Sequence, residues 1–143
     1  MQRDLRFEVV YPHAIEKVWR ALTDSRAIAQ WLMENDFEPR LGRKFQFWSK
    51  PQPGWDGTSH CEVIELDPPR RIAYTWRGGP IDTVLRITLE PVAGGTRLVL
   101  EHTGFRGFKA VLVSLIMGSG WKRIVNVAIP AVVARWDGGA AGV

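Results

Sequence analysis

Three histidines, one cysteine and seven tryptophans are the side chains of this sequence with the clearest potential for chemistry. His102 is the most informative, because it continues the alternation of Leu98 and Leu100 and can still titrate near neutral pH. A general base would also need an orienting acceptor and a substrate within hydrogen-bonding reach. Glu62 would supply that acceptor only if its side chain points inward. The alternative is a structural histidine that bonds a backbone carbonyl at the end of its strand.

The other candidates for catalysis or metal binding are weaker. His13, His60 and His102 fall on separate predicted elements, without the close spacing of metal ligands, so no metal site is expected. Cys61 follows His60 directly, and neighbours in a strand point to opposite faces, which argues against a Cys–His nucleophile. A single cysteine also excludes an internal disulfide. The glycine pairs resemble hairpin turns rather than phosphate-binding loops, so no cofactor is expected.

Length and composition indicate one globular domain, with 143 residues of which 45% are hydrophobic and 24% charged. The net charge of +4 comes from basic residues that are scattered along the chain, so no nucleic-acid partner is expected. The charged start of the chain has no apolar leader, and the longest nearly apolar run, 110–117, is about half of what a bilayer requires. We therefore expect a cytoplasmic protein without a membrane span.

The elements that position these residues follow from hydrophobic periodicity. Alternation predicts a strand over residues 3–11, and the spacing of Ile15, Val18, Trp19 and Leu22 predicts a helix after it. Asp24 and its neighbours supply capping groups for a second short helix. Further strands are predicted by alternation and turn residues at 44–47, 59–66, 71–77, 83–89 and 96–103.

Two strand features stay open at this level. In 59–66 either Cys61 and Val63 or Glu62 and Ile64 point inward. The Pro- and Gly-rich loop 51–57 is predicted to expose Trp55, which would mark an interface or a lid.

Two apolar helical stripes are predicted in the C-terminal part, one beginning at Phe108 and one running from Met117 to Val132. Because the stripes are out of phase, a helix break is predicted across Gly118-Ser119-Gly120, with Ser119 as the cap of the second helix. Pro130 is expected to bend that second helix. The apolar stretch 111–117 either forms a dimer surface or lines a cavity, and residues 138–143 are expected to form a flexible tail after a single domain of residues 1–137.

This order of elements predicts an α+β fold, in which a curved antiparallel sheet of about six or seven strands wraps around a long C-terminal helix, with two short helices after the first strand. Several segments resemble the activator of heat-shock protein 90 ATPase homologue-like family, part of the START-like (SRPBCC, helix-grip) superfamily. The resemblance is carried by residues 18–24, Trp31, 62–72, 89–91, 94–98, 102–105 and 120–121. Ala14 and Cys61 depart from it, since proline and glycine are usual there.

The resemblance implies an apolar cavity between the sheet and the C-terminal helix that binds a hydrophobic, lipid- or polyketide-like small molecule without catalysis. Apolar walls with a few polar groups are typical of such sites. The predicted wall consists of Trp31, Phe45, Phe47, Tyr74, Trp76, Leu100, His102, Leu112 and Trp121. A normally packed core is the alternative interpretation of the same residues.

Two other functions remain open. One is a cyclase- or dehydratase-type enzyme with His102 and Tyr74 as acid and base. The other is a chaperone-regulating interaction module, although in such relatives a separate N-terminal domain does most of the chaperone work. A small molecule is therefore the first expected partner, with a homodimer as a further option.

Overall fold

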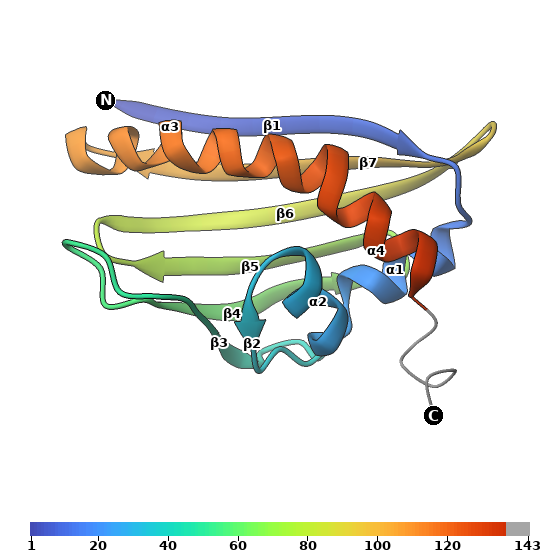
Figure 1. The fold of residues 1–143 in the computed structure, drawn as a ribbon, viewed down its shortest axis with the longest axis horizontal. Helices are drawn as coiled ribbons and strands as arrows, with labels where there is room; N and C mark the ends of the chain where they lie inside the picture. The colour runs from blue at the N-terminus through green and yellow to red at the C-terminus, as the bar shows by residue number, and fades with distance from the viewer. Residues whose placement is uncertain (137–143) are drawn as a thin grey trace.

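The computed structural model describes residues 1–136, so the expected tail of residues 138–143 lies outside the described residues. Seven antiparallel strands form one curved sheet, in the order β1-β7-β6-β5-β4-β3-β2 (Figure 1). The strands are β1 (Gln2–Tyr11), β2 (Glu34–Asn35), β3 (Lys44–Trp48), β4 (Thr58–Asp67), β5 (Arg71–Gly78), β6 (Ile81–Val92) and β7 (Gly95–Arg106). The helical elements are α1 (Ile15–Leu22), α2 (Ser25–Trp31), α3 (Phe108–Arg123), the π-helical turn η1 (Ile124–Ala128) and α4 (Ile129–Arg135). The predicted α+β helix-grip architecture is confirmed.

The two short helices form where the sequence predicts them. The Asp24 carboxylate accepts hydrogen bonds from the backbone amides of Arg26 and Ala27, which caps the start of α2. Buried apolar side chains of α1 and α2 close one end of the space beneath the sheet, where both helices lie beside α4 (Figure 1).

The inward face of the sheet follows the predicted alternation. On β5, β6 and β7 the inward side chains are buried, whereas their neighbours are partly or fully exposed with few exceptions. The open question in β4 is settled, because Cys61 and Val63 are buried and Ile64 is 44% exposed. A β-bulge between Val63 and Glu65 then shifts the register of β4 against β5.

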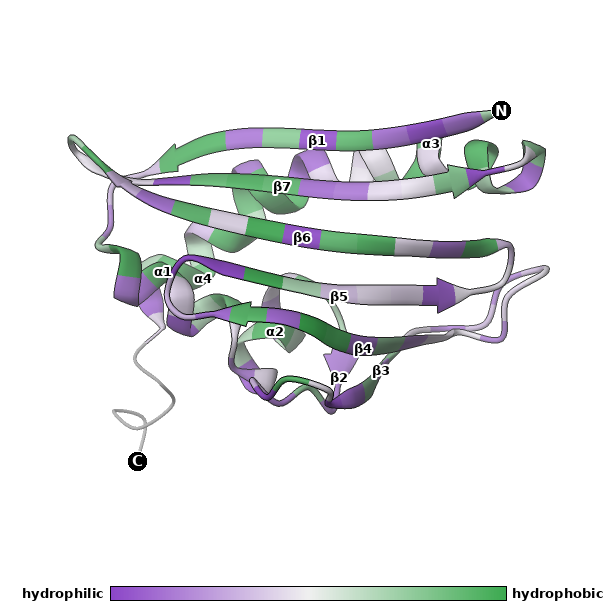
Figure 2. Cartoon of the chain, turned by 180° about the vertical axis from the view of Figure 1, so that it is seen from behind, coloured by the Kyte–Doolittle hydropathy of each residue, from purple (hydrophilic) through white to green (hydrophobic). Residues whose placement is uncertain are grey.

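The outward side chains of β1, β6 and β7 are mostly polar or charged. In the view from behind, none of the described helices lies over this face of the sheet (Figure 2). Ion pairs run across neighbouring strands here, with Arg97 contacting both Glu8 and Glu90 and Glu65 contacting both Arg71 and Arg86. Such exposed pairs each contribute little stability, about 0–1 kcal/mol. They do explain why one face of the sheet stays in water.

The C-terminal helix is continuous across Gly118, Ser119 and Gly120, so the predicted break and the Ser119 cap are wrong. The prediction rested on the two apolar stripes being out of phase, which requires a break only if the same side of the sheet covers both. In the structure only the arc with Ala110, Ser114 and Trp121 is buried, and the stripe from Phe108 faces outward. A Cβ on Gly118 would lie 3.4 Å from a Leu5 methyl group, so the small residues here let α3 lie close to β1.

The irregularity lies one turn later, next to Pro130. The Ile129 amide bonds to the Ile124 carbonyl, five residues back, and thereby passes over the Val125 carbonyl. Pro130 has no amide hydrogen with which to replace that bond. The Tyr11 hydroxyl donates instead, at 2.6 Å from the Val125 oxygen, across 114 residues of sequence. A side chain of β1 thus completes the backbone bonding of the C-terminal helix.

Trp55 is half-buried, so its predicted exposure is wrong. Its indole nitrogen donates to the Thr58 carbonyl at 2.8 Å, which folds the loop back on itself. The ring also lies against the β5–β6 turn, where a Cβ on Gly78 would come within 2.9 Å of the indole nitrogen. The tryptophan therefore anchors this loop against its neighbour.

We expect the Tyr11→Phe substitution to lower the free energy of unfolding by about 1–2 kcal/mol, because it leaves the buried Val125 carbonyl without a donor. Urea denaturation of both proteins measures this. An unchanged midpoint would show that the Tyr11 hydrogen bond does not stabilise the helix.

Candidate functional site

Eight of the nine predicted wall residues come together beneath the sheet. Trp31, Phe45, Phe47, Tyr74, Trp76, Leu100, His102 and Trp121 are each at most 2% exposed. Leu112 does not join them, because it lies on the outward side of α3 and is 47% exposed. The sheet and the C-terminal helix therefore enclose a common aromatic interior.

Ring contacts connect this interior from β3 to α3. Phe47 stacks on Trp76 with a centroid distance of 4.8 Å, and Trp76 meets Trp121 edge-on at 6.0 Å. On the other side Tyr74 packs edge-on against Phe45 at 5.1 Å. Offset and edge-to-face arrangements are those that aromatic pairs prefer.

His102 lies at the centre of a closed polar chain. The Trp121 indole N–H donates to His102 Nδ1 at 3.0 Å, so that nitrogen carries no proton. The neutral ring must then hold its proton on Nε2, which is 2.7 Å from the Thr83 hydroxyl oxygen. Thr83 in turn donates to the Trp76 carbonyl at 2.9 Å. These polar groups, one residue each from β5, β6, β7 and α3, thus have their hydrogen-bond partners within the chain.

This environment determines the charge of His102. Desolvation by burial lowers its pKa from 6.5 to about 3, because the charged ring would lose its hydration. At neutral pH the ring is uncharged, and its only lone pair already accepts a hydrogen bond. His102 therefore connects the helix to the sheet and is not poised to act as a general base in this conformation.

Tyr74 has a different environment. It is 2% exposed, yet no residue in the described part of the chain hydrogen-bonds to its hydroxyl. Burial raises the pKa of this hydroxyl, and Cys61 nearby adds to the effect. Burial likewise raises the pKa of the Cys61 thiol, so both groups stay protonated at neutral pH. Tyr74 thus presents a hydroxyl without a hydrogen-bond partner in the described chain, whereas the fully buried side-chain atoms without one are Arg43 Nε and Trp136 Nε1.

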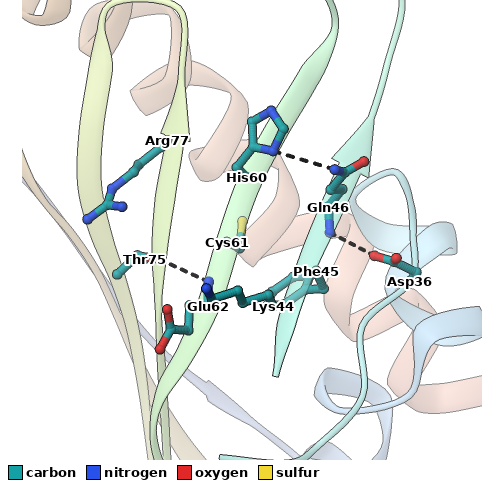
Figure 3. A pocket seen from close by; sticks show the side chains of 9 residues that line it. All are labelled: Asp36, Lys44, Phe45, Gln46, His60, Cys61, Glu62, Thr75 and Arg77. Atoms are coloured by element: carbon teal, nitrogen blue, oxygen red, sulfur yellow. Dashed lines mark hydrogen bonds between the residues drawn. The ribbon is translucent and has the colours of Figure 1, made fainter. Parts of the chain in front are cut away.

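Two pockets on the described residues open elsewhere. The larger, of about 470 Å³, is lined mainly by outward-facing side chains of β3, β4 and β5 (Figure 3). Its lining residues are Asp36, Lys44, Phe45, Gln46, His60, Cys61, Glu62, Thr75 and Arg77. The smaller, of about 270 Å³, lies over β5, β6 and β7 and includes Arg77 and Arg106. Within residues 1–136 no group of three or more His, Cys, Asp or Glu side chains could hold a metal ion.

Sequence analysis missed two interior residues. Thr83 precedes Leu85 in the same inward alternation, and that pattern could have been extended to it. Phe37 lies among acidic residues in the segment 34–38, but it is 3% exposed and contacts Phe45 edge-on at 5.1 Å. No periodicity marks it, because β2 beside it has only two residues.

Comparisons with known proteins agree with this architecture. The family model for Activator of Hsp90 ATPase homolog 1-like proteins matches residues 12–133. Protein MLL2253 from Mesorhizobium loti is 31% identical, with a TM-score of 0.84 and coverage of 94% of this chain and 99% of its own. Protein BH1534 from Bacillus halodurans is 28% identical, with a TM-score of 0.79 and coverage of 93% and 99%.

A structure described as the Aha1 dimer from Colwellia psychrerythraea shares the fold at 16% identity, with a TM-score of 0.71 and coverage of 86% of this chain and 90% of that one. The search of curated proteins found no match.

We expect Thr83→Val to lower the free energy of unfolding by about 1–3 kcal/mol, because the His102 Nε2–H and the Trp76 carbonyl both lose their partner. Thr88→Val is the matched control, since Thr88 lies on the outer face of the same strand. Urea denaturation compares them. Equal effects would mean that the polar chain contributes nothing beyond its packing.

The lowered pKa of His102 makes stability depend on pH. Between pH 6.5 and about 3 the unfolded chain binds a proton here that the folded chain does not. Stability is therefore complete above pH 6.5 and falls as the pH decreases, by about 1.4 kcal/mol per pH unit.

We expect His102→Gln, which cannot titrate, to lose less stability over this range than the parent protein. Urea midpoints measured between pH 7 and pH 4.5 give the two slopes. Parallel slopes would contradict the assignment of a neutral buried ring.

Proposed function

The chain belongs to the family of Activator of Hsp90 ATPase homolog 1-like proteins, and from that premise we propose that it binds an apolar small molecule with one hydrogen-bonding group between its sheet and its C-terminal helix. The Tyr74 hydroxyl is the observation that carries the proposal. This hydroxyl forms no hydrogen bond within the described chain, so a ligand with an acceptor would give it a partner, a bond that contributes about 0.5–1.5 kcal/mol.

The surroundings of Tyr74 define the chemistry of the ligand. Phe37, Phe45 and Phe47 lie with ring centroids 5.1–6.2 Å from the Tyr74 ring, so the ligand is flat or lipid-like and uncharged at this end. Its affinity comes from apolar burial, at about 25 cal/mol per Å² before ordering costs.

Binding requires that side chains move, since this interior is filled by aromatic rings. Phe37 is the side chain most easily displaced, because the loop between β2 and β3 carries it rather than the centre of the sheet. The backbone amide of its neighbour Asp36 donates a hydrogen bond to the Gln46 carbonyl at 3.4 Å, and the Gln46 amide donates one to the Asp36 carboxylate at 2.7 Å. The ligand takes the place of Phe37 against Tyr74 and Phe45.

Binding without catalysis is favoured over a cyclase or dehydratase. That alternative needs His102 and Tyr74 as acid and base, but both ring nitrogens of His102 are already hydrogen-bonded, to Trp121 and to Thr83. The raised pKa of Tyr74 also keeps its proton in place at neutral pH. Tyr74 therefore orients the ligand as a hydrogen-bond donor.

The test uses prodan, a neutral fluorescent naphthalene whose single ketone can accept a hydrogen bond. We expect the protein to bind prodan with a blue-shifted emission, and Tyr74→Phe to weaken binding about three- to tenfold. The same substitution should leave the stability of the free protein unchanged within about 0.5 kcal/mol, because no hydrogen bond within the protein is lost.

Tyr11→Phe is the matched control, since Tyr11 is equally buried but its hydroxyl is bonded to the helix. It should bind prodan as the parent protein does. Failure of the parent protein to bind prodan, or equal affinities of all three proteins, would refute the proposal. A small-molecule adduct seen only in native mass spectra would support it independently.

Regulation of a chaperone ATPase is the second candidate, and the description of the family favours it. It predicts that the purified chain changes the ATPase rate of an Hsp90 chaperone. A homodimer also stays a prediction for this chain, supported by the relative described as a dimer, and light scattering measures it.

A further inference from the structure

The first three turns of α3 carry apolar side chains that nothing in the described chain covers. Phe108 is 66% exposed, Leu112 47%, Leu115 50% and Ile116 75%. These four residues are here called the α3 outer face. Exposed apolar side chains that are contiguous indicate a surface for interaction, in contrast to isolated ones.

The α3 outer face is a single stripe. Its residues follow the spacing i, i+4, i+7 and i+8, which places them within about 100° of helix circumference. Ala110, Ser114 and Trp121 lie on the opposite arc, are buried, and face the sheet. Figure 1 shows α3 on the helical side of the sheet, along β1 and β7. The outer face is therefore directed away from the domain.

The positive charge of the protein is concentrated in the same segment. Residues 1–105 contain 14 basic and 14 acidic residues, and so carry no net charge. Residues 106–136 contain five basic residues and no acidic one. All five are exposed, and none forms an ion pair within the described chain.

Three of these basic residues border the stripe. Lys122 and Arg123 follow it about two turns later on the same side of the helix, and Lys109 lies at its margin. An apolar stripe with basic residues around it is typical of helices that lie in the surface of a membrane.

We propose that the α3 outer face docks on the surface of an anionic lipid bilayer. The apolar side chains enter the boundary between head groups and acyl chains, while Lys109, Lys122 and Arg123 contact the anionic head groups. A second copy of the chain is a poorer occupant, because a two-fold contact between α3 helices would bring two uncompensated basic segments together.

The helix lies on the membrane and does not cross it. The helical run Phe108–Arg135 is long and apolar enough to span a bilayer by length and composition, and only 22% of its most apolar window is buried. Its second half, however, is held in the core by Trp121, Val125 and Ile129. The part that carries the outer face, residues 108–119, is about 18 Å long, whereas a bilayer core is about 30 Å thick.

Vesicle flotation tests the proposal. We expect the protein to float with vesicles in which a third of the phosphatidylcholine is replaced by phosphatidylglycerol, and not with pure phosphatidylcholine vesicles. Added salt should release it, because screening weakens the attraction between the basic residues and the lipid.

Two variants separate the apolar and the basic contributions. Leu112→Gln with Ile116→Gln should lower the vesicle affinity at least about tenfold, because two exposed apolar side chains are lost. Lys122→Gln with Arg123→Gln should lower it by about fivefold for each charge. Leu41→Gln is the control for the apolar changes, at a leucine that is 64% exposed in the turn before β3. Lys50→Gln is the control for the charge changes, at an exposed lysine outside α3.

Equal binding to both kinds of vesicle, no binding to either, or equal loss in the control variants would overturn the proposal. So would conversion of a dimer to a monomer by the Leu112 and Ile116 changes, measured by light scattering, because the face would then belong to a second copy. Circular dichroism confirms that each variant is folded. Prodan binding to the interior is measured separately in the absence of lipid.

Discussion

The hydrogen-bond chain from Trp121 through His102 and Thr83 to the Trp76 carbonyl is the constraint on which this structure depends. It joins the C-terminal helix to three adjacent strands inside an aromatic interior, where an unsatisfied polar group is costly. Each donor has one acceptor, so the chain fixes the tautomer of His102 and the rotation of α3 together. The residue with the greatest catalytic potential in the sequence is thereby the one that holds the two layers in place.

The two tyrosines of the chain are both buried, but only the Tyr11 hydroxyl forms a hydrogen bond within the described residues. Tyr11 donates to the carbonyl that the π turn before Pro130 releases, and so completes the helix. Tyr74 is as deeply buried, but its hydroxyl has no partner within the described residues. Because no described residue bonds to it, this hydroxyl is the group that gives the proposed ligand its orientation. The basic, apolar outer side of α3 would bring the same domain to a membrane, where apolar ligands are found.

Much of the fold could be predicted because local patterns and the tertiary structure agree. The alternation on β5 to β7 identified the inward face correctly, and Asp24 caps α2 as its position suggests. The helix break at Gly118 to Gly120 failed for a physical reason: apolar periodicity reports where apolar side chains lie on a helix, not what covers them. Leu112 was placed in the interior by the same assumption, and the structure shows it half in solvent. Trp55 was expected in water, yet its loop folds back through one hydrogen bond to Thr58.

The sequence by itself determined the order of elements, the buried face of the strands other than β4 and the family, because these depend on local periodicity and short motifs. Only the tertiary structure decided that His102 is neutral and fully bonded, that Phe37 joins the core and that Tyr74 has no partner. Those properties depend on which side chains from distant segments meet within about 3 Å of a polar atom. Periodicity along one strand or helix carries no information about that distance.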